Sequence, residues 1–314
     1  MNEAISFESL IFPLTVADII SSYNAGTPLY QEGSAERFRS LCEAIKSQDD
    51  CLKDTDLNVT YASPGRESMS PLTPIEAGEI ETHYDAGGTI CITRMNIAFP
   101  VLNQLAKTCK ASLGWSGTVD CRSYISNNGA GYTPHFDDKS VITLQLEGCK
   151  QWMVSNTPAI RNPLENAGRF PDGVYRYFRD KPFMEIWEKF EQPQFSQASS
   201  YNLKPGDILI VPSGVWHSAC AKEHSLSLAI TLNHVGSGSA HDLIFLTLLQ
   251  QALSDPDWRG AVPMTPLHSR IESLDAIDNF FIDRLNALRD LVDKNLKDRT
   301  EIIRTWLRLI SDLN

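Results

Sequence analysis

The sequence predicts a fold made mainly of β-strands with α-helices at both ends, and two observations carry this prediction. Between residues 61 and 235, short apolar and β-branched runs such as TICITRM, DILIVP and LSLAITLN are separated by Gly, Pro, Asn and Asp. Short strands with frequent turn signals are typical of a β-sandwich or β-barrel. On either side of this region, apolar residues recur at the three- and four-residue steps of amphipathic helices. We therefore predict a helical segment at 1–60 that packs on the core, a β domain at 61–235, and a helical domain at 241–314.

The N-terminal segment is expected to contain an amphipathic helix within SAERFRSLCEAIKSQ, residues 34–48. Its apolar residues fall on one helical face: Phe38, Leu41, Cys42 and Ile45. Such a stripe predicts that the helix covers the β domain rather than standing free in solvent.

The C-terminal segment carries a longer apolar seam, and GSGSA at 236–240 predicts a flexible boundary before it. The residues of the seam step by three or four along one helix: Leu274, Ile277, Phe281, Leu285, Leu288 and Val292. The seam continues with Ile302, Trp306 and Leu309. Seams of this length pack on another helix, within one chain or between two chains, more often than they bind a cofactor. We expect a homodimer through residues 266–314.

One stretch of the β domain, residues 156–200, differs from its surroundings because it is rich in aromatic residues, charges and Pro. It is expected to be an insertion between strands, with a short helix near FMEIWEKF. Two interpretations stay open: a loop that covers the core, or a lid over a substrate.

Composition and charge narrow the function classes. The chain of 314 residues has room for one sizeable core and a smaller domain. Its net charge of −11 argues against a nucleic-acid or anionic-membrane surface, although an acidic surface still suits a basic peptide. No apolar run reaches about 18 residues and the start has no basic region, so we expect neither a membrane span nor a signal peptide. Seven cysteines without a Cys-x-x-Cys pair suggest free thiols in a reducing cytoplasm.

Two His-x-Asp pairs raise the question of a metal site: His83 with Asp85 in THYDAGG, and His135 with Asp137 in YTPHFDDKS. On a β-strand, residues two apart point to the same face, so either pair could supply two ligands. Either pair could equally be ordinary polar residues where a strand meets a turn. Spacing alone does not choose between them.

The residues that follow each pair favour the second one. A non-haem iron site needs two His and one carboxylate, and KPGDILIVPSGVWHSA offers a strand with His217 as the third ligand. We prefer His217 to His224, which lies in a predicted loop. Lys150, fifteen residues past His135, can bind the carboxylate of an organic acid, whereas Ala98 stands at the same distance from His83.

The other polar and aromatic residues near these motifs receive simpler interpretations. His83 and Asp85 are interpreted as a solvated pair at a strand end. Asp138 is expected on the opposite face from Asp137, as a neighbour of the site or an exposed residue. Trp152 is expected in the core of the barrel.

The segment PHFDDKSVITLQLEGCKQW, followed by KPGDILIVPSGVWH, resembles the JmjC oxygenases of the cupin superfamily, and most of all the ribosomal oxygenases and related cupin-like protein hydroxylases. The resemblance covers roughly residues 85–235. It implies a double-stranded β-helix, or jelly-roll, as the core. It also gives the C-terminal helices the character of a dimerisation bundle.

The resemblance implies a role for each matching residue. The iron ligands would be His135, Asp137 and His217. Lys150 would bind the 5-carboxylate of 2-oxoglutarate, and Tyr124 in CRSYISNN would help to hold it. Asn233 in AITLNHV falls near a polar position that lines the co-substrate pocket.

These implications lead to a predicted function. The protein is expected to be an oxygenase that uses Fe(II), 2-oxoglutarate and O₂, with ascorbate as an activator, and releases succinate and CO₂. The leading hypothesis is hydroxylation of the β-carbon of an amino-acid residue in a peptide or protein. Three alternatives stay open: hydroxylation of a free amino acid or natural-product intermediate, demethylation of N-methyl-lysine, and a non-catalytic metal-binding cupin.

Overall fold

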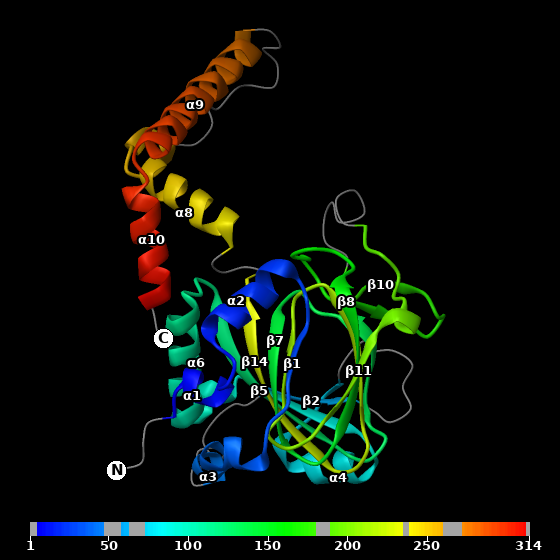
Figure 1. Cartoon of the computed structure of the whole chain (residues 1–314). Coiled ribbons are helices and arrows are strands. Elements are labelled where there is room, and N and C mark those ends of the chain that lie inside the picture. Colours follow the sequence, from blue (N-terminus) through cyan, green and yellow to red (C-terminus); the bar gives the residue numbers. More distant parts are fainter. Residues whose placement is uncertain are drawn as a thin grey trace. The chain divides into compact units, whose positions relative to one another are not determined.

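The computed structural model describes residues 5–46, 58–62, 73–179, 189–234, 239–259 and 272–311, which form two compact units, residues 1–235 and 236–314 (Figure 1). The first unit holds two antiparallel β-sheets and most of the shorter helices. The second unit is helical. The units are described separately below.

The larger sheet of the first unit contains eight strands. Their order across the sheet is β1 (Leu29–Gln31), β12 (Ile208–Val211), β7 (Ser140–Glu147), β14 (Ser225–Asn233), β5 (Thr118–Ser126), β4 (Thr89–Thr93), β2 (Asn58–Ala62) and β3 (Thr73–Pro74). The predicted mainly helical N-terminal segment thus also supplies β1, which pairs with β12 at the edge of the sheet.

The smaller sheet contains six strands. Their order is β10 (Tyr175–Tyr177), β9 (Ala167–Arg169), β6 (Gly131–Phe136), β13 (Val215–Ala221), β8 (Lys150–Pro158) and β11 (Ser199–Leu203). The chain alternates between the two sheets in the order β5, β6, β7, β8 and again in the order β11, β12, β13, β14. This alternation winds the strands into the predicted jelly-roll, with the two sheets facing each other (Figure 1).

Six described α-helices belong to the first unit, and a seventh, α8, begins the second. They are α1 (Phe7–Ile11), α2 (Val16–Ala25), α3 (Arg39–Lys46), α4 (Ile80–Asp85), α5 (Met95–Ala98), α6 (Pro100–Leu113) and α8 (Ala240–Ala252). Short 3₁₀ turns occupy Ala35–Phe38, Ala77–Glu79, Phe195–Gln197 and Pro256–Arg259. The helix expected within 34–48 therefore divides into a 3₁₀ turn and α3. Phe38 and Leu41 are buried in it, as the stripe requires.

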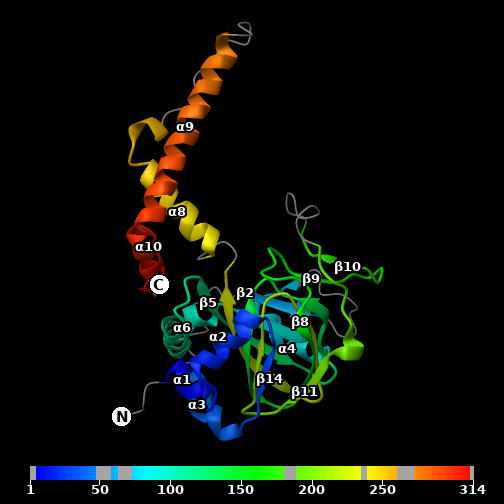
Figure 2. The same cartoon turned by 45° about the horizontal axis from the view of Figure 1, so that its top comes forward.

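The larger sheet has two chemically different faces, because side chains alternate along each strand. On β7, Ile142 and Leu144 point into a hydrophobic core shared with α1, α2 and α6, which cover this face (Figure 2). Val141 and Thr143, the intervening residues, line a cavity between the sheets. The same strands thus build the core on one side and a functional cavity on the other.

The second unit consists of α8, α9 (Glu272–Lys297) and α10 (Thr300–Ser311). The side chains of Gln251 and Asn295 are hydrogen-bonded to each other at 3.2 and 2.8 Å, and Thr247 bonds Thr305 at 3.2 Å. Ser239 accepts a hydrogen bond from the backbone of Asp242 and so caps α8. Residues 236–238 of the predicted GSGSA boundary lie outside the described residues.

A search of the described helices found none whose length and apolarity would let it cross a bilayer. The helix predicted near FMEIWEKF also lies mainly outside the described residues, which resume at 189.

Replacing Leu144 by Ala tests the packing of the larger sheet. Leu144 is fully buried and lies between β12 and β14, so the cavity left behind should lower the free energy of unfolding by about 2–5 kcal/mol. Chemical denaturation followed by circular dichroism measures this loss. Ile97→Ala is the control, because Ile97 is 58% exposed, and it should change the free energy by no more than about 0.5 kcal/mol. Equal effects of the two substitutions would contradict the assigned core.

Candidate active site

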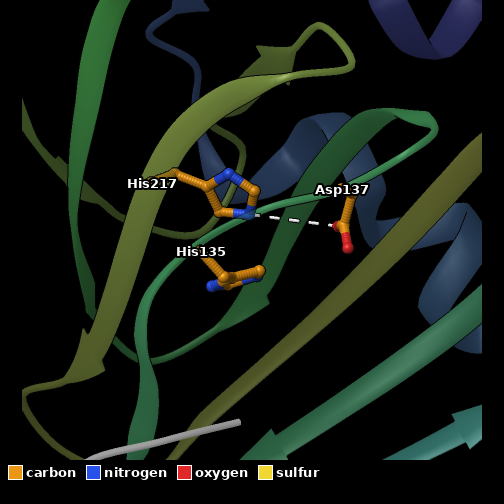
Figure 3. A group of neighbouring side chains, drawn as sticks. All are labelled: His135, Asp137 and His217. Carbon is orange, nitrogen blue, oxygen red and sulfur yellow. Dashed lines mark ion pairs between the residues drawn. The ribbon is translucent and has the colours of Figure 1, made fainter. Parts of the chain in front are cut away.

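Three side chains on one face of a strand pair meet inside the jelly-roll (Figure 3). His135 lies on β6 directly opposite His217 on β13, and their ring centroids are 4.1 Å apart. Asp137 follows the end of β6, and its Oδ2 is 4.0 Å from His217 Nε2. Each of the three offers one ligand atom within 4.8 Å of the others. The structure therefore brings together the three residues that the sequence predicts as metal ligands.

Hydrogen bonds fix the orientation of both imidazoles. His135 Nδ1 lies 2.7 Å from the carbonyl oxygen of Thr133, and His217 Nδ1 lies 2.9 Å from that of Val215. Because a carbonyl can only accept, each Nδ1 carries the proton and donates it. Each Nε2 then keeps its lone pair for a metal, the arrangement in which a second hydrogen bond orients a metal-binding histidine.

The protonation states also suit a metal. Burial lowers the pKa of His135 to about 3 and lowers the pKa of His217, so both rings are neutral. Burial alone would raise the pKa of Asp137, but its electrostatic interactions with Lys139, the two imidazoles and Arg122 outweigh burial and hold this pKa below its usual range. Two neutral imidazoles and one carboxylate fit Fe(II), with coordination positions left for other ligands.

Lys139 is a neighbour of the site that the sequence motifs did not identify. It is buried, and its Nζ lies 3.6 Å from Asp137 Oδ1 and 3.4 Å from Asp138 Oδ1. The backbone N–H of Asp138 donates to Asn166 Oδ1 at 2.7 Å. Asp138 thus lies beside the three ligands and is held by its own contacts. The signal for Lys139 in the sequence was its place directly after His-x-Asp-Asp.

The three ligands open into a cavity of about 670 Å³ between the sheets. Lys150 and Tyr124 both line it, and the Lys150 ammonium lies 6.0 Å from the centre of the Tyr124 ring. Lys150 is 2% exposed and forms no ion pair with a described carboxylate. Burial lowers its pKa to about 8. A buried cation without a protein partner predicts an anionic ligand.

Asn233 does not lie with these residues. Its amide donates weak hydrogen bonds of 3.4 Å to the Thr118 carbonyl and to Thr231 Oγ1, at the end of β14. The residue of β14 that lines the cavity is Ser227. Six positions separate the two, which is about 20 Å along a strand. The two residues share a face of the strand, but they lie at different depths.

Trp152 packs against a smaller hydrophobic core cluster, as expected of a core residue, and it also forms part of the cavity wall. Its ring stacks on His217 with centroids 5.7 Å apart and planes inclined by 26°. The predicted insertion contributes further wall residues: Glu165, Asn166, Phe178 and Arg179. Part of the insertion is therefore next to the site, as either interpretation of it requires.

The alternative ligand candidates, the His83–Asp85 pair and His224, lie outside this site. His83 and Asp85 belong to α4, not to a strand end as predicted, and the His83 ring packs on Tyr61 at 4.4 Å between centroids. The strand expectation failed because the two-residue spacing also occurs where a helix approaches a Gly-rich turn. His224 Nδ1 is 2.7 Å from the hydroxyl of Tyr84, and His224 is not among the residues that line the cavity.

A jelly-roll with two histidines and a carboxylate at its centre defines a metal-binding protein of the cupin class. Residues 97–238 match the family model described as the JmjC domain. This match confirms the predicted resemblance to JmjC domains over the matched residues.

The matches to curated relatives cover different shares of those proteins. The uncharacterized protein YxbC of Bacillus subtilis is 26% identical over 283 residues, which are 85% of this chain and 82% of YxbC. A Drosophila mojavensis protein named bifunctional lysine-specific demethylase and histidyl-hydroxylase NO66 is 29% identical over 181 residues. This match covers 57% of the present chain but only 18% of NO66.

Solved structures of ycfD from Escherichia coli share the fold. One superimposes with a TM-score of 0.54 at 15% identity, covering 87% of this chain and 68% of that chain. Another is described as ycfD, a ribosomal oxygenase, in complex with cobalt and 2-oxoglutarate. It has a TM-score of 0.52 at 13% identity and covers 95% of this chain and 71% of the other.

Titration with Co(II), followed by the visible absorption of the bound ion, tests the metal site. His135→Ala should abolish tight cobalt binding, because it removes one of three ligands that lie within 4.8 Å of one another. His83→Ala is the matched control, since its ring packs on Tyr61, and it should bind cobalt like the wild type. Loss of cobalt binding in His83→Ala, with binding retained in His135→Ala, would assign the metal to the other His-x-Asp pair.

Proposed function

We propose that the protein is an Fe(II)- and 2-oxoglutarate-dependent oxygenase that hydroxylates a C–H bond, most directly the β-carbon of an amino-acid residue in a peptide or protein. One observation carries the proposal: a complete set of three metal ligands shares its cavity with a buried lysine that forms no ion pair with a described carboxylate. A cupin that bound metal only for structural reasons would have no use for that cation.

The residues that line the cavity would have different roles. His135, Asp137 and His217 would hold the metal. Bound iron with 2-oxoglutarate and O₂ supplies the oxidation of a C–H bond to an alcohol, with release of succinate and CO₂. Lys150 would bind the 5-carboxylate of 2-oxoglutarate through a charge-assisted hydrogen bond. Burial raises the pKa of Tyr124 well above its ordinary value, so the phenol stays protonated and can donate to the same carboxylate.

Relatives support a peptide or protein as substrate. The ycfD structures are described as a ribosomal oxygenase, and the NO66 proteins are named for activity on histidyl and lysine residues. The insertion residues in the cavity wall add surface that a large substrate could contact. The six described cysteines form no disulfide, which supports the proposed reducing, cytoplasmic environment.

Release of succinate from 2-oxoglutarate, in the presence of Fe(II) and ascorbate, tests the enzymatic proposal. At pH 7 Lys150 is below its pKa of about 8, so the wild type should bind the co-substrate and turn it over. His135→Ala should lose turnover, and Lys150→Ala should raise the dissociation constant for 2-oxoglutarate about 10- to 100-fold. Lys222→Ala is the control, because Lys222 is exposed. A wild type that neither binds 2-oxoglutarate nor releases succinate would exclude the oxygenase.

We also propose that residues 241–314 form a dimerisation domain. The apolar seam of α9 is exposed within the single chain, with Leu285 65%, Phe281 47% and Val292 38% exposed. Exposed apolar patches of this kind mark protein interfaces. In a dimer, α9 of each chain would pack on α9 of the other, so that the two apolar seams bury each other.

Light scattering tests the dimer. The wild type should show twice the chain mass of 35.0 kDa at micromolar concentration, and Leu285→Asp should reduce it to a single chain by placing a charge in the seam. Arg289→Ala, a change at an exposed position of the same helix, should leave the mass unchanged. A single-chain mass for the wild type would overturn the proposal.

A further inference from the structure

We propose that the substrate carries a carboxylate close to the carbon that reacts, and that Arg122 binds this carboxylate. The inference rests on the proposed oxygenase function and names the chemical class of its substrate. It depends on the position of Arg122, on the contacts that it makes, and on the charge of the cavity.

The position of Arg122 follows from the alternation of β5. Asp120, Arg122 and Tyr124 are two residues apart, and all three line the cavity. Tyr124 lies at the Lys150 end, where the co-substrate is expected. Arg122 is two residues further along the strand, about 7 Å away. It lines the same cavity and interacts electrostatically with Asp137 and with Tyr124, so it lies within electrostatic range of the metal ligands and of the co-substrate end.

The contacts of Arg122 use only part of its guanidinium. Its Nε donates to Asp120 Oδ2 at 2.8 Å, and the two side chains are 23% and 14% exposed. Asp120 therefore holds the guanidinium in one orientation. The terminal nitrogens of Arg122 make no hydrogen bond or ion pair with any residue in the described parts of the chain. Such a held but unsaturated guanidinium matches the two oxygens of a carboxylate.

The charge of the cavity favours an anion. Five basic and three acidic residues line it, although the whole chain has a net charge of −11. Two of the five already have assigned roles: Lys139 lies beside Asp137, and Lys150 lies at the co-substrate end. Of the others, Arg94 and Arg179 are exposed, and Arg94 directly follows β4, whose Ile92 pairs with Ser123 beside Arg122. A basic cavity in an acidic protein attracts anions and repels a lysine or arginine side chain.

These observations restrict the substrate. A carboxylate held by Arg122 would place the carbons next to it beside the metal ligands. Aspartate and glutamate fit this description, either as residues of a peptide or as free amino acids. The two sources share the same recognition chemistry, and the experiment separates them.

Binding to the cobalt-loaded holoprotein with 2-oxoglutarate, followed by the visible spectrum of cobalt, gives a readout that does not require turnover. The probes are the N-acetyl methylamides of aspartate, glutamate, asparagine and lysine, together with free L-aspartate and L-glutamate. An acidic probe should bind about 10- to 100-fold more tightly than the asparagine and lysine probes. Tighter binding of the capped probes would assign a peptide source, and tighter binding of the free acids a free amino acid.

Variants then connect the preference to Arg122. Arg122→Gln should remove the preference for acidic probes, and Arg122→Lys should keep part of it, while the affinity for 2-oxoglutarate stays within about twofold in both. The unchanged co-substrate affinity also shows that the variants are folded. Arg176→Gln is the matched control, because Arg176 pairs with Asp172 outside the cavity, and it should bind every probe like the wild type.

The outcomes separate this inference from the function on which it rests. Loss of the acidic preference in Arg122→Gln, with retained 2-oxoglutarate binding, supports the inference. A wild type that turns over 2-oxoglutarate but binds no acidic probe, or binds asparagine or lysine probes equally well, overturns the inference alone. A wild type that does not bind 2-oxoglutarate overturns the proposed function and the inference together.

Discussion

The antiparallel pairing of β6 with β13 is the constraint on which the site depends. It places His135 directly opposite His217, although 82 residues separate them in the chain. Each ring donates from Nδ1 to the carbonyl two residues before it, Thr133 or Val215, so each strand orients its own ligand. Asp137 reaches the same point because it follows β6 without an intervening residue. A shift of this pairing by one residue would turn one histidine to the other face of the sheet.

The part of the site that could be predicted depends on local periodicity. The two-residue spacing of His135 and Asp137 on a strand is a property of a few consecutive residues, and strand alternation turns it directly into a shared face. Lys150 and His217 were found because each begins or follows a recognisable strand with a turn before it. The predicted β domain and its flanking helices are confirmed for the same reason, since apolar periods of two and of three to four distinguish strands from helices. The jelly-roll itself was implied by the family resemblance.

The part that could not be predicted depends on depth and on context beyond a single element. Alternation says which face a residue occupies but not how far along the barrel it lies, so Asn233 and Ser227 look equivalent in the sequence although only Ser227 reaches the cavity. Lys139 and Arg122 each pair with an aspartate two residues before them, Asp137 and Asp120, but the cavity that gives these pairs a role is closed by other strands. For β1, three residues of strand within a helical segment are set by pairing with β12 rather than by their own pattern.

Lys150 and Arg122, the two cavity cations with proposed ligands, differ in how they tolerate burial, and this difference fits those ligands. Lys150 has no described carboxylate partner, and burial lowers its pKa to about 8, so an anionic ligand would stabilise its charged form. For Arg122, burial alone would lower the pKa, but Tyr124 and Asp120 outweigh it and raise this pKa. Arg122 therefore stays charged, and Asp120 fixes its orientation. A small flexible ammonium suits a co-substrate that enters at every turnover, whereas a guanidinium held by Asp120 keeps a fixed geometry that can select among substrates.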